Sequence, residues 1–238
     1  INMVETCHSQ GFMIYVDMVV NHMVGAPATG FGTAGSYYDT DTMQFPGVPY
    51  GPNDFNCCWC GMCNSGSCGI DSYQDVNQVR NCRLVGLVDL ALSTDYVRQK
   101  IADYFNDLIG IGVAGFRVDA CKHMWPGDME AVYARVNNLN TRWFPANTRP
   151  FIFNEVIDLG GEAISAQEYT HLGRVTEFKY CNHIASAFRR DYPISNLGSL
   201  GESWGMLPSG DALVFVENHD NQRGHGAGGD RILTFYEP

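Results

Sequence analysis

The sequence has no apolar run long enough to cross a membrane, although 45% of its 238 residues are hydrophobic. A spanning helix needs about 20 consecutive apolar residues, so we expect no membrane segment. Positive charge is also scarce, because 15 Lys and Arg face 26 Asp and Glu and give a net charge of −11. Phosphate repels such a chain, so no nucleic-acid partner is expected. The apolar content excludes an intrinsically disordered protein.

An initiator Met and a signal-peptide pattern are lacking too, because the chain begins at Ile1 with no charged-then-apolar segment. The other end stops at Pro238 without a terminating element. We therefore expect an internal piece of a longer chain, with any signal peptide outside it. The length suits one large domain or two modest ones.

Cysteine, in contrast, is plentiful, and five of the nine cysteines crowd into residues 57–68. Cys60 and Cys63 have the spacing of zinc ligands, but no second such pair follows and no histidine lies nearby. Disulfides of a secreted protein are the alternative that we favour. An odd number leaves at least one thiol free or paired elsewhere. Cys121 and Cys181 lie in apolar contexts, which predicts buried, unreactive side chains.

Strand and helix patterns alternate, which predicts a parallel α/β architecture. Apolar runs predict strands at residues 12–20, 114–119, 151–157, 175–180 and 212–218. Spacings of three and four predict helices at residues 2–10, 94–110, 129–139 and 184–190. Gly11 would end the first helix. Residues 23–90 lose all periodicity and are rich in Gly, Pro, Cys, Asn and Tyr, so we expect an inserted subdomain there.

Acidic residues recur where the predicted strands end. Asp17, Asp119, Glu155 and Asp220 each lie at or just beyond the carboxyl end of a different strand. A single such acid is most often a helix cap or a loop residue, but four in succession are typical of a (β/α)8 barrel. The active site of that fold is built at this face. The sequence therefore predicts an active site rich in carboxylates.

Arg117 and Asp119 are two residues apart on one predicted strand, so their side chains point to the same side. If Asp119 faces the barrel mouth, Arg117 is buried just below it. A buried cation needs an anionic partner. That partner is either a carboxylate or a bound anion, and strand geometry does not decide between them.

Carboxylates accompanied by His22 and His219, with no phosphate-binding glycine motif, favour hydrolysis of a sugar bond. Glycosidases hold one carboxyl group protonated as an acid and a second one ionised. Sugar rings also pack on aromatic side chains, which Tyr15, Trp59, Tyr73 and Trp125 would provide.

Four segments carry a resemblance to a known family. Residues 16–22 read Val-Asp-Met-Val-Val-Asn-His, and residues 115–123 read Gly-Phe-Arg-Val-Asp-Ala-Cys-Lys-His. Residues 153–158 read Phe-Asn-Glu-Val-Ile-Asp, and residues 215–226 read Phe-Val-Glu-Asn-His-Asp-Asn-Gln-Arg-Gly-His-Gly. In this order they resemble the α-amylase family of retaining glycoside hydrolases, in particular its animal-type members. Residues 86–90 and the glycine loop 224–229 extend the resemblance.

The resemblance implies a partial (β/α)8 TIM barrel, about strands three to seven, with a small loop-rich domain inserted after strand three. Residues 1–22 would form the first barrel part. Residues 23–90 would form the inserted, calcium-linked domain B, and residues 91–238 the second, catalytic barrel part. The barrel would be incomplete at both ends.

The resemblance also assigns roles to single residues. Asp119 would be the nucleophile, Glu155 the general acid/base and Asp220 the third carboxylate, which positions the sugar and stabilises the transition state. Further residues would line the sugar sites: Asp17, His22, Tyr73, Lys122, Ile157 and His219.

Two bound ions are implied as well. A structural calcium would join the inserted domain to the barrel through Asn21, Asp89 and the backbone carbonyls of Arg80 and His123. Oxygen ligands of this kind suit Ca²⁺. A chloride beside the acid/base would be held by Arg117 and Asn218, with a third ligand beyond Pro238, so chloride dependence stays open.

Some positions depart from the family pattern. Glu217 replaces the usual Asp, and Asn81 stands where relatives often carry an acid near the calcium, so we expect weaker calcium binding. The family partner of Cys7 falls at Ala34, which predicts a free Cys7. Cys63 and Cys82 keep the spacing of a family disulfide, whereas Cys57, Cys58, Cys60 and Cys68 lie in an insertion without a counterpart.

The resemblance implies a secreted, extracellular and monomeric enzyme that cleaves internal α-1,4-glucosidic bonds of starch, glycogen and malto-oligosaccharides with retention of configuration. A related α-glucosidase or glucosyltransferase would share the three carboxylates. A non-catalytic sugar-binding homologue is another alternative, although such a protein has no need to keep all three. The remaining alternative is a zinc-dependent interaction module built on residues 57–68.

Overall fold

Parallel strands followed by helices make up much of the computed structural model, which describes residues 1–56 and 61–234. Our predictions for Cys57, Cys58, Trp59 and Cys60 therefore lie outside the described residues. The chain divides into two compact units, Ile1–Ile152 and Phe153–Pro238, called here the N-terminal and C-terminal units. Among the described residues, no helix combines the length and the hydropathy needed to cross a lipid bilayer.

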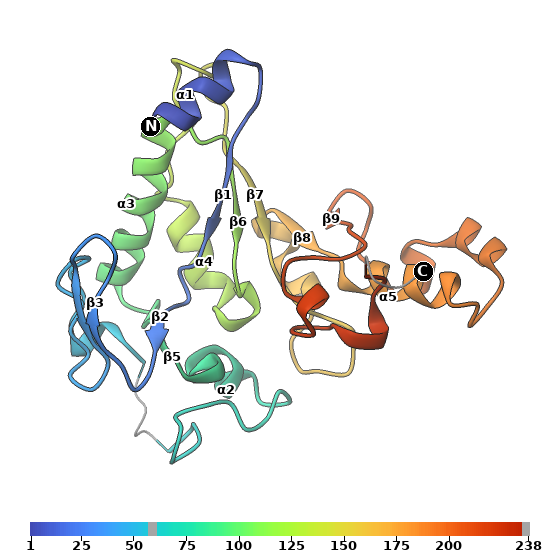
Figure 1. Cartoon of the computed structure of the whole chain (residues 1–238), viewed down its shortest axis with the longest axis horizontal. Coiled ribbons are helices and arrows are strands. Elements are labelled where there is room, and N and C mark those ends of the chain that lie inside the picture. Colours follow the sequence, from blue (N-terminus) through green and yellow to red (C-terminus); the bar gives the residue numbers. More distant parts are fainter. Residues whose placement is uncertain (57–60, 235–238) are drawn as a thin grey trace. The chain divides into compact units, whose positions relative to one another are not determined.

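The N-terminal unit contains the first parallel strands and most of the helices (Figure 1). Its elements are α1 (Asn2–Ser9), β1 (Tyr15–Met18), β2 (His22–Gly25), β3 (Thr29–Phe31), β4 (Tyr37–Asp39), α2 (Val76–Asn81), β5 (Leu87–Asp89), α3 (Asp95–Ile111), β6 (Gly115–Val118) and α4 (Pro126–Tyr133). Strand β7 (Phe151–Asn154) begins in this unit and ends in the next. The strand order is β1-β6-β7 here and β7-β8-β9 in the C-terminal unit.

Local sequence explains where the long helix α3 begins and ends. The Thr94 side chain accepts a hydrogen bond from the Val97 N–H (3.4 Å), as expected of a helix N-cap. Gly112 ends the helix with φ of 115°, a left-handed conformation that suits glycine. Phe105, on the buried face of α3, meets Phe116 of β6 edge to face at 4.7 Å. Aromatic packing thus fixes α3 against the sheet.

Strand β1 pairs with β6 in parallel, and residues 15–18 lie opposite residues 115–118 in register. The two predicted strands are confirmed, although each is shorter than its apolar run. Asp17 lies opposite Arg117, and the Asp119 N–H donates to the Met18 carbonyl oxygen (3.0 Å). The acidic residues of both strands therefore meet at the carboxyl edge of the pair.

Residues 23–90, where the sequence loses its periodicity, form turns, two short antiparallel strand pairs and the short helix α2. Strand β2 pairs antiparallel with β5, with His22 opposite Asp89, and β3 pairs antiparallel with β4. Helix α2 is capped by Asp75, whose side chain accepts from the Asn77 and Gln78 N–H groups. In Figure 1, α2 and the β2–β5 pair lie beyond the carboxyl ends of β1 and β6.

A disulfide joins Cys63 to Cys82, as the resemblance implied. The Cys63 sulfur is therefore not available as a zinc ligand, which makes the zinc interpretation of the Cys60–Cys63 pair wrong. Within residues 1–56 and 61–234, no cluster of three or more His, Cys, Asp and Glu side chains is arranged to hold a metal ion. Cys7 forms no disulfide, and Cys121 and Cys181 are buried as predicted.

Helix α4 ends earlier than the apolar spacing predicted. Val136 and Leu139 are buried, but the helix stops at Tyr133. The backbone amides that would continue it bond elsewhere, because the Asn137 N–H donates to the Asn106 side chain and the Leu139 N–H donates to the Thr148 carbonyl oxygen. The apolar spacing thus predicted correctly that these residues are buried, but it predicted wrongly that they are helical.

The C-terminal unit contains the end of β7, β8 (Arg174–Thr176), α5 (Phe178–Phe188) and β9 (Ala212–Leu213). Strand β8 pairs in parallel with both of its neighbours. The predicted strand at 175–180 is wrong beyond Thr176. Glu177 is the N-cap of α5 and accepts from the Lys179 N–H (2.9 Å), so the helix begins six residues before its predicted start. Strand β9 is short because its partner β8 ends there.

Candidate active site

Arg117 bridges two of the predicted site carboxylates. Its Nη1 donates to Asp119 Oδ1 at 2.9 Å and to Asp17 Oδ1 at 2.5 Å. The Arg117 side chain is only 15% exposed, so the anionic partner that its burial required is present. That partner is a pair of carboxylates, brought together because Asp17 and Arg117 are opposite in the β1–β6 register.

His22 follows directly after Asn21 in the same unit. The Asn21 side-chain amide lies 3.3 Å from His22 Nδ1. Because an amide N–H donates, the ring nitrogen acts as the acceptor and the ring proton is placed on Nε2. Burial lowers the pKa of His22, although the nearby charge of Asp119 partly opposes this effect. Burial therefore favours the neutral form of the His22 ring.

Tyr73 and Lys122 also come together, although 49 sequence positions separate them. The Lys122 ammonium lies 5.0 Å from the Tyr73 ring centre, and the edge of that ring meets His123 at 6.2 Å. Lys122 is buried, whereas Tyr73 is 38% exposed. An exposed aromatic ring stacked on a cation offers both a packing surface and a hydrogen-bond donor to a sugar.

The four predicted calcium ligands are all buried within the N-terminal unit. The Leu90 N–H donates to the Asn21 carbonyl oxygen (2.9 Å), which fixes Asn21 beside Asp89. His123 Nδ1 donates to the Val79 carbonyl oxygen (2.9 Å), which fixes His123 beside Arg80. Asn21, Arg80 and His123 line one small cavity. Three of the four residues that the resemblance assigned to the metal, Asn21, Arg80 and His123, thus lie around one cavity, and Asp89 lies beside Asn21.

Asp89 has an asymmetric environment. The Asn56 amide donates to its Oδ2 at 2.7 Å, whereas Oδ1 is buried and has no hydrogen-bond partner among the described residues. Burial raises the pKa of Asp89 to about 8. A buried carboxylate oxygen without a donor is costly unless a cation binds it. The Asp89 carboxylate therefore fits a hard metal ion.

Asn56 is the residue of this site that sequence reasoning missed. It lines the same cavity as Asn21, Arg80 and His123. Its contacts run to strand β5, more than thirty positions away, and no local pattern marks it. An antiparallel bridge between Phe55 and Leu90 brings the two segments side by side.

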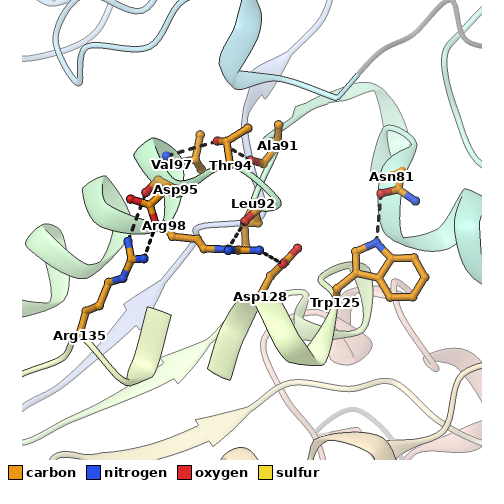
Figure 2. Close-up of polar contacts among 10 residues, drawn as sticks. All are labelled: Asn81, Ala91, Leu92, Thr94, Asp95, Val97, Arg98, Trp125, Asp128 and Arg135. Carbon is orange, nitrogen blue, oxygen red and sulfur yellow. Dashed lines mark hydrogen bonds and ion pairs between the residues drawn. The ribbon is translucent and has the colours of Figure 1, made fainter. Parts of the chain in front are cut away.

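Asn81, which departs from the family pattern, is turned toward Trp125. Figure 2 shows the Trp125 indole N–H donating to Asn81 Oδ1, at 3.1 Å. The Arg80 guanidinium lies over the same indole ring, 4.8 Å from its centre. The Asn81 amide also donates to the Asn77 carbonyl oxygen (2.8 Å). The oxygen of this side chain thus joins α2 to Trp125, while its amide group bonds within α2.

The remaining predicted site residues belong to the C-terminal unit. Glu155 is buried directly after β7, and Ile157 packs against a cluster of Phe178, Cys181 and Ile232. His219 Nε2 lies 3.7 Å from Asp220 Oδ1, and both side chains are partly exposed. Asn218 Oδ1 accepts from the Asp220 and Asn221 N–H groups (3.0 and 2.8 Å), which shapes the turn that presents Asp220.

Comparison with known proteins assigns the family. The family described as "Alpha amylase, catalytic domain" matches residues 1–234. The chain belongs to the alpha-amylase family. It is 58% identical over 240 residues to pancreatic alpha-amylase of Sus scrofa and 56% identical over 242 residues to an alpha-amylase of Oryzias latipes. These alignments cover 99% and 100% of this chain but 46% of either relative, so the chain spans about half their length.

Solved structures agree with this assignment. Wild-type alpha-amylase I of Eisenia fetida matches with a TM-score of 0.94 and 55% identity, over 99% of this chain and 48% of that one. An alpha-amylase of Geobacillus thermoleovorans matches with a TM-score of 0.63 at 19% identity, over 92% of this chain and 43% of that one, and supports the fold alone. The predicted fold class, a partial (β/α)8 barrel with an inserted loop-rich segment, is confirmed.

Proposed function

We propose that the complete protein cleaves internal α-1,4-glucosidic bonds of starch and glycogen with retention of configuration. The observation that carries this proposal is the placement of Asp119 at the carboxyl end of β6, hydrogen-bonded to the half-buried Arg117, which also contacts Asp17. Retaining glycosidases need an ionised carboxylate as nucleophile, and the guanidinium favours that form. A mutant of the Eisenia fetida enzyme is named as a complex with maltohexaose, which supports malto-oligosaccharides as ligands.

Asp119 is the proposed nucleophile, which attacks the anomeric carbon and forms a glycosyl-enzyme. Glu155 is the proposed acid/base: it protonates the leaving oxygen and then removes a proton from the attacking water. Its buried position directly after β7 shields it from bulk water. Asp220 is the proposed third carboxylate, and its partial exposure suits direct contact with sugar hydroxyl groups.

The sugar sites are proposed to be lined by Asp17, His22, Tyr73, Lys122, Ile157 and His219. Asp17 is half exposed beside Arg117, and the exposed Tyr73 ring provides a packing surface. His22, which burial keeps neutral, has its Nε2–H available as a donor to a sugar hydroxyl.

A calcium ion is proposed as a structural cofactor, held by the side chains of Asn21 and Asp89 and the carbonyl oxygens of Arg80 and His123. The buried Asp89 Oδ1 supports this assignment. Amide, carboxylate and carbonyl oxygens are the ligands that Ca²⁺ prefers. When bound, the ion would neutralise Asp89 and link the two ends of residues 23–90 to the segment that carries His123.

Chloride is proposed as a second ion, with Arg117 and Asn218 as ligands. Arg117 contributes a guanidinium with five N–H donors. Asn218 Oδ1 already accepts from two backbone N–H groups, so the amide's other polar group is its NH₂ donor, which suits an anion. When bound, chloride would supply a fixed negative charge near the acid/base.

We also propose that the protein is secreted, extracellular and monomeric. The Cys63–Cys82 disulfide supports an oxidising compartment. The division into residues 1–22, 23–90 and 91–238 is proposed as the functional arrangement of barrel and inserted domain.

Hydrolysis of soluble starch by the complete protein tests the function, with the products analysed by chain length and by the configuration of the new anomeric carbon. Retained configuration and a broad mixture of oligosaccharides are expected. Glucose alone would indicate an α-glucosidase, and new glycosidic bonds would indicate a glucosyltransferase. Binding without turnover would indicate a sugar-binding homologue.

Glu155→Gln tests the acid/base role. We expect a loss of about 10²–10⁴-fold or more in kcat while starch binding survives. Glu130→Gln is the matched control, because Glu130 is an exposed acid of α4. If Glu155→Gln kept a tenth of the wild-type rate, Glu155 would not be the acid/base.

A further inference from the structure

We propose that Asn56 is a positioning residue for calcium: it holds Asp89 so that one carboxylate oxygen faces the ion. This inference rests on the calcium site of the proposed function. Asn56 is not itself one of the proposed calcium ligands, so its effect would pass through Asp89.

Asn56 makes three contacts with the end of strand β5. Its Nδ2 donates to Asp89 Oδ2 at 2.7 Å and to the Leu90 carbonyl oxygen at 3.3 Å. Its backbone N–H donates to the Asp89 carbonyl oxygen at 2.9 Å. Side chain and backbone of Asp89 are therefore both fixed by the same residue.

The consequence for Asp89 is a carboxylate with two different oxygens. Oδ2 is held by the amide, which fixes the rotation of the carboxylate about its last bond. Oδ1 is buried and has no hydrogen-bond partner among the described residues. Asn56 lines the cavity that Asn21, Arg80 and His123 also line. A buried carboxylate with one oxygen held and the other without a donor is preorganised for a cation.

The chemistry of an amide suits this task. An Arg or Lys in the place of Asn56 would also orient Asp89, but its positive charge would compete with the ion. The neutral amide donates a hydrogen bond and leaves the full negative charge of the carboxylate for Ca²⁺. Groups that orient metal ligands in this way typically contribute about 10–100-fold in metal affinity.

The test measures calcium binding to the chelator-stripped complete protein by titration calorimetry, together with the melting temperature in calcium and in EDTA. The variants are Asn56→Leu, Asn56→Ser, Asp89→Asn and the control Gln99→Leu. Gln99 makes the same kind of amide–carboxylate contact, to Asp103 at 2.8 Å, but on the exposed surface of α3. Asn56→Ser shortens the side chain and keeps a polar group.

We expect both Asn56 variants to weaken calcium binding by about 10–100-fold and to reduce the difference between the two melting temperatures. Gln99→Leu should leave both quantities unchanged. A merely structural Asn56 would lower both melting temperatures equally and leave the affinity within about twofold, and that result would overturn the proposal. If both Asn56 variants failed to fold in excess calcium, the proposal would also be overturned, because Asn56 would then be required for folding itself. If Asp89→Asn kept wild-type affinity, the calcium site itself would be wrong.

Discussion

Arg117 Nη1 donates to Asp119 Oδ1 at 2.9 Å while it also contacts Asp17 Oδ1. One cation thus holds two carboxylates that would otherwise repel each other. The arrangement follows from the parallel β1–β6 register, which sets Asp17 opposite Arg117. It fixes the proposed nucleophile, Asp119, through a residue that does not itself react.

Arg117→Gln should therefore lower the free energy of unfolding and remove chloride activation together. The bond to Asp119 should contribute about 1.5–3 kcal/mol and the pair with the half-exposed Asp17 little more, so we expect a loss of about 1.5–3 kcal/mol in urea unfolding. Arg174→Gln is the control, because Arg174 forms a long, exposed pair with Asp211 at 3.8 Å. If chloride still activates the Arg117→Gln variant, Arg117 is not a chloride ligand.

Asp119→Asn should reduce turnover by several orders of magnitude, because an amide cannot form the covalent glycosyl-enzyme. Mass spectrometry of the wild type, trapped with a slow fluorinated substrate, should find the sugar on Asp119. Asp103→Asn, at an exposed site of α3, should keep full activity. Label on any other residue would contradict the assignment.

Removal of calcium should loosen residues 23–90 first, because the proposed ligands Asn21 and Asp89 lie at the two ends of this segment. At calcium 100-fold above its Kd, binding contributes about 2.7 kcal/mol. We expect EDTA to lower the melting temperature and to expose this segment to protease, whereas EDTA presaturated with calcium does neither. Identical melting curves in both solutions would argue against a structural calcium.

Two arginines of the N-terminal unit should differ in their importance for stability. Arg98 donates to the Leu92 carbonyl oxygen (2.7 Å) and pairs with the buried Asp128, whereas Arg135 pairs with Asp95, which is 81% exposed (Figure 2). Exposed pairs contribute about 0–1 kcal/mol. Arg98→Gln should cost about 1.5–3 kcal/mol and Arg135→Gln less than about 1 kcal/mol, both measured by urea unfolding. Equal losses would contradict this ranking.

The thiols of Cys7 and Cys181 should differ in reactivity. Burial raises the pKa of Cys181 to about 11, and the thiolate is the reactive form. The folded protein should therefore keep Cys181 protonated and unmodified by iodoacetamide at pH 8.5, while the half-buried Cys7 is alkylated. Both should react after unfolding in denaturant. Rapid alkylation of Cys181 in the folded protein would show that it is accessible.

Sequence patterns predicted the elements whose signals are local. The helix that Thr94 caps and Gly112 ends was predicted within two residues, and every predicted parallel strand has a counterpart in the structure. The paired acids Asp17 and Asp119 were predicted as well, because strand periodicity and the ends of parallel strands are properties of short segments.

The errors have a common physical cause: hydrogen bonds to residues far along the chain override the local sequence pattern. The apolar run at 175–180 indicates a strand, yet Glu177 accepts from the Leu207 N–H (2.7 Å) and the Lys179 N–H and starts a helix. Asn56 was missed for the same reason, since its importance depends on Asp89 of strand β5. No local pattern in the sequence contains such a contact.

The β2–β5 pair has a consequence for engineering. His22 lies opposite Asp89, and the Leu90 N–H bonds to the Asn21 carbonyl oxygen, so the chain leaves and re-enters the barrel at one point. A loop fastened at both ends tolerates changes in length, because doubling it costs only about 0.6 kcal/mol in closure entropy. The segment between these ends is therefore an exchangeable module. Grafts that keep Asn21, Asn56, Arg80 and Asp89 should vary its length and its sugar contacts while the strands beneath it remain unaltered.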